Sequence, residues 1–369
     1  MPPEPDAPSA PLDELGFYAL AGHAADPRSV LVEARDGEQL GLGAAFVSER
    51  FNVKDAPTLS GAIGAVTDRL GVASAATNHN TRHPLVTATY ASTMHALTGG
   101  RFALGLGRGF DALFDVMGLR RVTAAQLVDV IEVLRRLWRD EHVVGHDGPA
   151  GRYPYLHQGA GLDGTVPVIL VAIGPRTLEL AGAVADAVVL HTFFADATLE
   201  RAVASVRRGA ESAGRDPAQV RVWSVLATVG DHLDEPARLR KLVGRLATYL
   251  QGYGDLLVRV NGWDPEVLAR FRAAEVVTSA RGAIDATATT AELEAIAELL
   301  PEEWLAAAAT GPPERCAATV ADQFRLGADS VVLHGATPAE LAPVVEAYRS
   351  VRPDGVGERC TANPGWLRS

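Results

Sequence analysis

Eight short, almost wholly apolar segments alternate with longer segments of helical periodicity along most of this chain. Such short apolar runs are typical of strands buried on both faces, and their alternation with helices indicates βα units in a parallel sheet. The expected strands cover residues 15–21, 43–49, 70–77, 101–107, 166–172, 187–191, 220–229 and 329–334. Helices are expected at 29–40, 84–97, 124–138, 176–184, 199–213 and 313–326.

Eight parallel strands with intervening helices close naturally into a barrel, so the sequence predicts an α/β fold, a TIM (β/α)8 barrel. An open, doubly wound sheet is the alternative. It usually has fewer strands and a glycine-rich turn after the first strand, and no such turn follows residues 15–21. We expect one domain over 12–350, with insertions at about 141–164 and 231–311, the second mostly helical and directly before the last βα step. Residues 1–11 are expected to be a disordered tail and 351–369 a C-terminal tail.

The composition argues against several classes of function. A net charge of −11 disfavours a broad nucleic-acid-binding face. No apolar run reaches the ~18–20 residues that span a membrane, and the first residues lack the basic start and apolar stretch of a signal peptide. The two cysteines, Cys316 and Cys360, lie far apart, which argues against a disulfide framework and fits a reducing cytoplasm. We therefore expect a cytoplasmic protein that acts on a small molecule and binds neither nucleic acid nor membrane.

Active sites of TIM barrels lie at the carboxyl ends of the strands, so the residues that follow each apolar run are the candidates. The third run is followed by a dense polar cluster at 77–83, which includes Thr77, Asn78 and His79. A turn and a helix cap would need only one or two of these residues, so the cluster indicates a hydrogen-bonding wall for a planar polar ligand. His79 and His83 are spaced like metal ligands, but they precede Pro84 in a loop and no third ligand is evident, so no metal site is expected.

Two further strand ends point to a ligand. Glycines occupy alternate positions around Gly107, Arg108 and Gly109. A backbone without side chains can approach a ligand closely, but the same pattern is also explained by a tight turn at the end of a strand. The fifth strand runs through Ala172 and Ile173 into Gly174, Pro175 and Arg176. A glycine turn before a helix exposes backbone N–H groups that suit a phosphate, although an ordinary βα turn would look the same.

Single titratable groups stand at three more strand ends, namely Glu49, His191 and His334. Each can serve as a general acid or base if its pKa is tuned, and each is as readily explained by a structural hydrogen bond. The helical insertion contributes apolar and aromatic residues, including Tyr249, Tyr253 and Trp263, which suggests a partly hydrophobic ligand.

The run from Arg101 to Gly109 (RFALGLGRG) resembles a signature of the luciferase-like monooxygenase superfamily, and more specifically its branch that uses the deazaflavin coenzyme F420. Residues 70–84, 166–175, 180–188 and 314–334 are similar to further segments of that superfamily in the same order. The resemblance implies a TIM barrel that binds FMN or F420 and that commonly forms a homodimer.

The resemblance also implies roles for individual residues. It places a non-prolyl cis peptide near Ala73 and Ser74, against the cofactor ring. It places Thr77 and Asn78 at the ring, Gly107, Arg108 and Gly109 beside the ring and tail, and Gly174, Pro175 and Arg176 at the phosphate, with Ala172 and Ile173 leading to it. The chain departs from the pattern after the second strand, where relatives have a carboxylate followed by histidine and this sequence has Glu49 followed by Arg50. The proton donor is therefore assigned to Glu49 or His79.

The segment Gly107–Asp111 looks more like the F420-dependent branch than the FMN-dependent one. We therefore expect an F420-dependent oxidoreductase that transfers a hydride to or from a small organic substrate. An FMN-dependent monooxygenase is the alternative, and a non-catalytic cofactor-binding homologue is the alternative of another class. A sugar-phosphate barrel enzyme would require paired acid and base groups or metal ligands at the strand ends, and the sequence has no convincing set.

Overall fold

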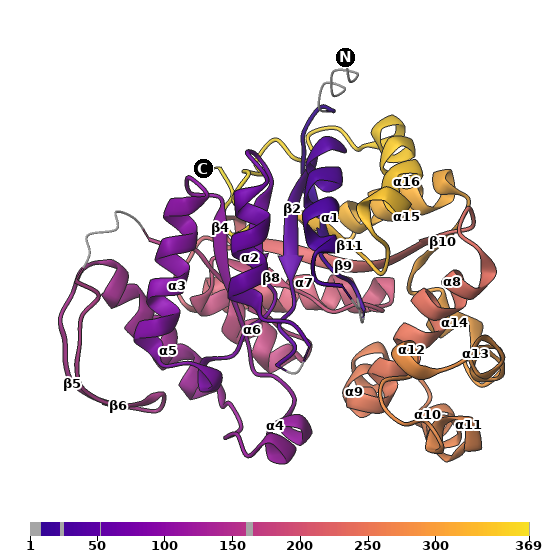
Figure 1. The fold of residues 1–369 in the computed structure, drawn as a ribbon, viewed down its shortest axis with the longest axis horizontal. Helices are drawn as coiled ribbons and strands as arrows, with labels where there is room; N and C mark the ends of the chain where they lie inside the picture. Colours follow the sequence, from indigo (N-terminus) through magenta and orange to yellow (C-terminus); the bar gives the residue numbers. More distant parts are fainter. Residues whose placement is uncertain (1–8, 23–25, 52, 160–164, 369) are drawn as a thin grey trace.

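The computed structural model describes residues 9–22, 26–51, 53–159 and 165–368, and its centre is a closed barrel of parallel strands (Figure 1). The strands pair in the order β9, β11, β1, β2, β3, β4, β7, β8, and a further pairing of β8 with β9 closes the ring. The predicted TIM barrel is therefore confirmed. The barrel strands are β1 (Leu12–Tyr18), β2 (Leu42–Val47), β3 (Gly71–Ser74), β4 (Phe102–Gly107), β7 (Val168–Val171), β8 (Ala187–Val189), β9 (Arg221–Gly230) and β11 (Ser330–His334).

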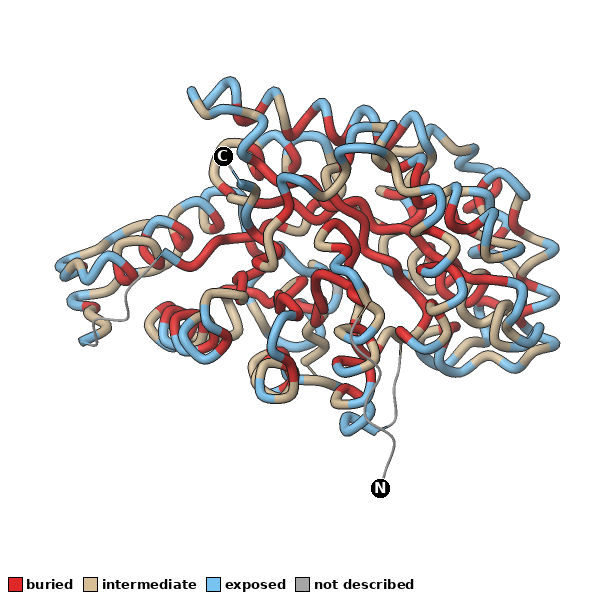
Figure 2. The backbone as a smooth tube through the Cα atoms, turned by 90° about the horizontal axis from the view of Figure 1, so that it is seen from above, coloured by how far each residue is buried: buried red, intermediate tan, exposed pale blue. Residues whose placement is uncertain are grey.

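Helices surround the barrel on its outer side, so that the buried strands occupy the middle of the molecule and the exposed residues its rim (Figure 2). Most of them begin at a cap or at a proline that favours a helix start; Asp55 and Thr123, for example, accept a hydrogen bond from a backbone N–H of the first turn. The surrounding helices are α1 (Ser29–Gln39), α2 (Ala56–Ala65), α3 (Pro84–Leu97), α5 (Ala124–Trp138), α6 (Pro175–Val184), α7 (Asp196–Ser212), α15 (Pro313–Arg325) and α16 (Pro338–Val351), with short 3-10 turns η1 (His79–Thr81) and η2 (Pro217–Gln219).

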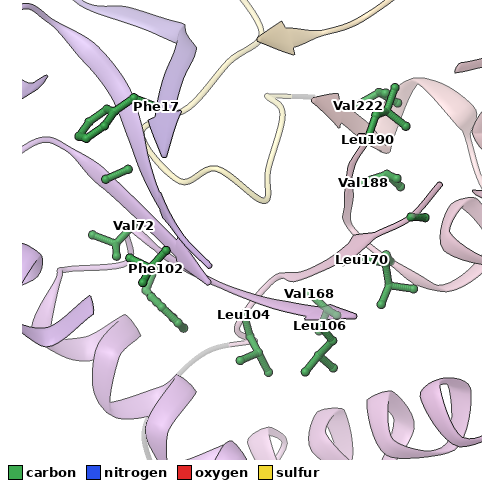
Figure 3. Packing of buried hydrophobic residues seen from close by; sticks show 14 of the residues in the cluster. Phe17, Val72, Phe102, Leu104, Leu106, Val168, Leu170, Val188, Leu190 and Val222 are labelled. Atoms are coloured by element: carbon green, nitrogen blue, oxygen red, sulfur yellow. The ribbon is translucent and has the colours of Figure 1, made fainter. Parts of the chain in front are cut away.

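Side chains of alternate strand residues fill two separate layers. Leu104, Leu106 and Leu170 belong to the outer layer, where they pack between strands and helices (Figure 3). The barrel interior holds another cluster, in which small residues such as Ala73 leave room for Phe46 and Trp223, whose ring centroids lie 4.9 Å apart. This alternation of two apolar faces explains why the strands read as unbroken apolar runs.

The first strand differs from its prediction, since it covers Leu12–Tyr18 and not 15–21. The apolar run does continue after Tyr18, but Leu20 has a φ of 51°, a left-handed backbone conformation that a strand cannot include. Residues 19–22 therefore form a turn at the barrel end. Of the N-terminal tail expected at 1–11, residues 1–8 lie outside the described residues.

Two insertions lie toward the carboxyl ends of the strands, the side to which β2 points in Figure 1. The first is an antiparallel hairpin after α5, with the strands β5 (Val143–Gly148) and β6 (Gly151–Leu156). Residues 160–164 of this insertion lie outside the described residues. The short helix α4 (Asp111–Met117) precedes α5 in the chain. The second is the helical insertion after β9, with an apolar core of its own. It comprises α8 (Glu235–Leu239), the π-helix η3 (Arg240–Gly244), α9 (Arg245–Asn261), α10 (Pro265–Ala273), α11 (Glu275–Thr278), α12 (Ile284–Thr287), α13 (Thr290–Ala297), α14 (Glu302–Leu305) and β10 (Ala309–Gly311).

The C-terminal segment after α16 crosses the opposite end of the barrel, where the strands begin (Figure 1). The fully buried Arg221 at the start of β9 donates hydrogen bonds to the carbonyls of Thr361, Asn363 and Trp366. Asn363 in turn donates to the carbonyls of Gly100 and Phe102. The segment is therefore docked and closes the amino-terminal end. Within the described part of the chain, no helix is both long and apolar enough to cross a membrane.

Candidate active site

The end of β3 is joined to the end of β4 by close backbone contacts. The peptide bond between Ala75 and Ala76 is cis, two residues beyond the position expected from the resemblance. It follows directly after β3, which ends at Ser74 and is shorter than the strand predicted at 70–77. Ser74 Oγ accepts a hydrogen bond from the Gly105 N–H at 2.8 Å, and Thr77 N–H donates to the Gly105 carbonyl at 3.0 Å. A Cβ atom on Gly105 would lie 1.7 Å from the Ser74 carbonyl oxygen. Gly105 is thus required by strand packing.

Asn78 and His79 lie buried at this strand end. Asn78 Nδ2 donates to the Gly107 carbonyl at 2.6 Å, so its amide connects the loops after β3 and β4. His79 is 8% exposed, and its Nε2 atom has no hydrogen-bond partner among the described residues. Burial lowers the pKa of His79, which favours a neutral imidazole. An unpartnered ring nitrogen in this position is available to a ligand.

Glu49, expected to be a proton donor, is held by neighbouring residues. Its side chain is 2% exposed, and Arg82 contacts both of its oxygens in an ion pair. Thr77 Oγ1 and the Ala56 N–H also donate to it. Because the carboxylate accepts all four of these hydrogen bonds, it is placed to hold the ends of β2 and β3 together and is poorly placed to donate a proton.

Two tyrosines of α9 face the barrel end, where they meet the histidines at the ends of β8 and β11. His191 Nδ1 lies 2.7 Å from the Thr192 carbonyl oxygen, which makes Nδ1 the donor and leaves Nε2 to accept a hydrogen bond from the Tyr253 hydroxyl. Burial lowers the pKa of His191 to about 4, so the imidazole is neutral. Tyr249 stacks on His334, with 6.4 Å between the ring centroids.

This pairing of Tyr253 with His191 was missed by the sequence reasoning, which treated the two residues separately. Tyr253 lies where α9 is kinked, with φ −150° and ψ 34°. The periodicity of apolar residues in the sequence does not predict this kink. Trp263, also expected near the ligand, instead stacks on Trp304 inside the insertion, with centroids 4.6 Å apart.

The loops expected to hold a cofactor tail are only partly arranged for it. Gly174 precedes α6 without a side-chain cap, and a Cβ added there would meet only Leu256, at 3.8 Å, so the start of α6 is open to a ligand. Arg108 donates instead to the Val122 carbonyl at 2.8 Å. The Arg176 side chain lines a groove between α6 and α7.

The remaining expected cofactor residues lie at these strand ends in different surroundings. Ala73 lies in the barrel interior, and the Ala172 N–H donates to the Val189 carbonyl at 3.1 Å. Gly109 has a φ of 69°, which a residue with a side chain rarely adopts, and Gly107 continues β4. Ile173 lies half-buried between Ala172 and Gly174. Across the described residues, no cluster of three or more histidine, cysteine or acidic side chains could hold a metal ion.

Comparison with known proteins gives consistent matches. A model of the luciferase-like monooxygenase family matches residues 14–330. A 5,10-methylenetetrahydromethanopterin reductase of Methanolobus tindarius is 30% identical over 241 residues, which cover 64% of this chain and 72% of that protein. A phthiodiolone/phenolphthiodiolone dimycocerosates ketoreductase of Mycobacterium tuberculosis is 31% identical over 202 residues, and the match spans about half of each protein, 53% of this chain and 51% of the ketoreductase.

Solved structures share the fold. The coenzyme F420-dependent tetrahydromethanopterin reductase of Methanopyrus kandleri superimposes with a TM-score of 0.77 at 20% identity, over 92% of this chain and 99% of that one. An F420-dependent secondary alcohol dehydrogenase, solved with an F420-acetone adduct, has a TM-score of 0.71 at 19% identity and the same coverage, 92% and 99%. Together with the family match over most of the barrel, these findings establish that the chain belongs to the luciferase-like monooxygenase family and is an oxidoreductase.

Proposed function

We propose that this protein is an F420-dependent oxidoreductase that transfers a hydride between the deazaflavin and a small organic substrate. The observation that carries the proposal is the buried, unpartnered Nε2 atom of His79 at the end of β3, beside Thr77 and Asn78. The curated relatives support the reductive chemistry, because one is named a methylenetetrahydromethanopterin reductase and another a ketoreductase.

The residues present fit a flavin-type cofactor. A planar ring with polar edges would satisfy the His79 nitrogen, which is otherwise costly to bury without a partner. The uncapped start of α6 at Gly174 offers backbone N–H groups and a positive helix end to a phosphate in the cofactor tail. We assign Asn78, Gly107 and Gly109 to the ring and its attachment, and the backbone N–H groups of Gly174 and Arg176 to the phosphate, with Pro175, which has no N–H, fixing the helix start between them. Arg108 fixes the loop through its bond to Val122.

The bound deazaflavin would supply or accept the hydride. The chain would handle the proton, and the pair of Tyr253 and His191 is arranged for it. The tyrosine hydroxyl donates to the imidazole, which orients the phenol. Burial raises the pKa of Tyr253 and lowers that of His191, so the proton rests on the tyrosine, from which a strongly basic substrate oxygen formed by hydride transfer would take it. His79 is the second proton-handling candidate. Glu49 becomes a positioning residue, since it orients Thr77 and Arg82.

Titration of the purified chain with F420 and with FMN, followed by absorbance and fluorescence, tests the proposal. We expect F420 to bind at micromolar concentration and FMN at least tenfold more weakly. His79→Leu should weaken F420 binding about tenfold, equivalent to about 1.4 kcal/mol, whereas His142→Leu, at an exposed hairpin position, should not. Tight binding of FMN alone would replace the proposal by FMN-dependent monooxygenation. F420 binding with no turnover of any ketone or alcohol would favour a non-catalytic homologue.

We further propose that the enzyme acts as a homodimer in the cytoplasm. Both cysteines, Cys316 and Cys360, are buried free thiols, which suits a reducing compartment. Light scattering of the eluted protein would test the dimer, and a mass of one chain, 38.9 kDa, would refute it.

A further inference from the structure

The loop after β2 presents two cations, Arg50 and Lys54, on the two sides of a tight turn. The backbone N–H of each donates to the carbonyl of the other, at 3.1 and 2.9 Å. The Lys54 ammonium reaches the loop after β1 and donates to the Leu20 carbonyl at 2.9 Å. Lys54 is therefore fixed at the carboxyl end of the barrel, between the first and second strands.

A third cation arrives at the same loop from α9. Arg245 is 5% exposed and forms an ion pair of 2.8 Å with Asp285. A Cβ atom built on Gly22, two residues after Leu20, would lie 2.8 Å from Arg245 Nη2, so the guanidinium lies directly over this loop. Arg245 Nε has no hydrogen-bond partner among the described residues.

Among the described residues, Lys54 forms no ion pair with a carboxylate, and its ammonium donates to backbone carbonyls of the loop after β1. Asp285 pairs with Arg245, and Glu33 Oε2 accepts a hydrogen bond from the Leu20 N–H at 2.7 Å. Burial, followed by the charges of Arg50 and Arg245, lowers the pKa of Lys54 to about 7. Burial also raises the pKa of Glu33, which weakens its negative charge. Burial of the Lys54 charge without a paired carboxylate and of the Arg245 Nε donor without an acceptor is costly, and an anion bound here would offset the cost.

Neutral aromatic side chains adjoin the cations on the barrel side. Arg245 Cζ lies 6.0 Å from the centre of the Tyr249 ring, and the ring of Tyr18 meets His334 edge-on at 5.0 Å. Burial and the neighbouring cations hold the pKa of His334 well below its usual value, so this histidine adds no charge. Lys241, the other nearby lysine, is paired with Glu340 at 2.9 Å. An anionic group at the cluster would thus extend from a neutral, ring-lined surface at the barrel end.

We propose that Lys54, Arg245 and Arg50 bind an anionic oxygen group of the substrate, a carboxylate or a phosphate. Guanidinium and ammonium donors make their strongest hydrogen bonds with such groups. The anion site itself follows from the geometry, and only its assignment to the substrate rests on the proposed function. The substrate would then carry its reacting carbon beside Tyr249 and Tyr253 while its charged end stays at the loops after β1 and β2.

The first test uses the full chain without cofactor, with sulfate and acetate as probes at constant ionic strength against chloride. We expect one of the two probes to raise the melting temperature with a saturable dependence on concentration, sulfate indicating a phosphate group and acetate a carboxylate. Lys54→Gln and the charge-neutral double variant Arg245→Gln/Asp285→Asn should weaken this effect at least tenfold. Arg259→Gln removes an exposed charge from the same helix and should leave it unchanged. Sulfate also stabilises proteins by exclusion from their surface, but that contribution does not saturate and is common to all variants. An effect equal in all four proteins, or without saturation, refutes the site.

The second test follows protons. An anion beside Lys54 should raise its pKa again, so binding near pH 8 should take up protons, measured by calorimetry in two buffers of different ionisation enthalpy. The groups that face Lys54 are Arg50, Arg245, Glu33 and His334. Lys54→Gln should abolish the uptake, and uptake that persists in this variant contradicts the proposal.

The third test distinguishes substrate from cofactor tail. F420 affinity is measured with and without a saturating concentration of the probe anion. Unchanged affinity supports a substrate site, whereas competition refutes that assignment. If the anion binds and F420 does not, the proposed function fails while the anion site remains.

Discussion

Substitution of Glu49 by glutamine decides whether this carboxylate holds strand ends together or donates a proton. Glutamine has the same shape but only one acceptor oxygen, so it keeps the bond from Thr77 Oγ1 or the bond from the Ala56 N–H, which reach different oxygens of Glu49, and not both. It loses the negative charge that faces Arg82, which contacts both carboxylate oxygens. The perturbation therefore falls on the ion pair with Arg82 and on one further hydrogen bond of the same carboxylate, all between the loops after β2 and β3.

The structure sets the size of the effect. A hydrogen bond to a charged group contributes about 1.5–3 kcal/mol, and Arg82 makes two of them to Glu49. Arg82 is 20% exposed and keeps a 2.7 Å bond to Asp55, so solvent and a second partner reduce the loss. We expect Glu49→Gln to lower the free energy of unfolding by about 2–4 kcal/mol. Arg82→Gln leaves a carboxylate buried without its cation and should cost about 3–5 kcal/mol.

Urea unfolding of the two single variants and the double variant measures the coupling, which we expect to be about 1.5–3 kcal/mol. Turnover measured on the same proteins supplies the second readout, and a positioning residue should lower activity no more than the loss of folded protein explains. If Glu49→Gln unfolds like the unaltered chain but loses about a hundredfold or more in kcat, as expected for removal of a general acid, the carboxylate is the proton donor and not a positioning residue.

Three further predictions follow from buried polar groups. Tyr253→Phe removes the donor to His191 Nε2 and should lower the free energy of unfolding by about 1–3 kcal/mol together with kcat, measured by urea unfolding and by turnover. Folding lowers the Lys54 pKa from 10.5 to about 7, so between these pH values the unfolded chain binds more protons than the folded chain. The free energy of unfolding should therefore rise with pH across that window, and it should rise less in Lys54→Met. Urea unfolding at several pH values measures both. Arg221→Met leaves three tail carbonyls without their donor and should cost more than about 3 kcal/mol, with faster limited proteolysis within 359–368.

The barrel was predictable because its signal is repeated. Each of the eight apolar runs can be recognised as a buried strand without knowing which strands it pairs with. The residue at which a strand ends, in contrast, depends on a single backbone conformation. At Leu20 a positive φ ends the first strand although the residues remain apolar. Helix α2 was not foreseen, because Gly61 and Gly64 interrupt its helical pattern; a Cβ on Gly64 would lie 2.9 Å from Thr98, so close packing requires a small residue there.

The location of the candidate site was predictable, but the role of each side chain was not. Polar residues after an apolar strand belong at the barrel end in any TIM barrel, which is why the clusters around Thr77 and Gly174 were identified. Their partners come from elsewhere in the chain: Arg82 meets Glu49 across 33 positions, and Tyr253 meets His191 across 62. Such pairs depend on the register of neighbouring strands and on the kink in α9. Neither of these can be inferred from the spacing of residues along the sequence.

Two buried arginines differ in whether the fold supplies acceptors for their N–H groups, and this difference separates a structural arginine from one that is available to a ligand. Arg221, at the amino-terminal end, donates to Ser330 Oγ and to backbone carbonyls of the tail and of Asp13, and stacks 4.2 Å from the Trp223 ring. Its donors are used within the fold, so it needs no ligand. Arg245, at the carboxyl-terminal end, is nearly as buried, yet its Nε has no hydrogen-bond partner among the described residues. A buried donor without a partner costs about 1–3 kcal/mol, and the fold has placed it where barrel enzymes bind their substrates. An anion bound at this position would supply the missing acceptor and remove the cost of burying this donor.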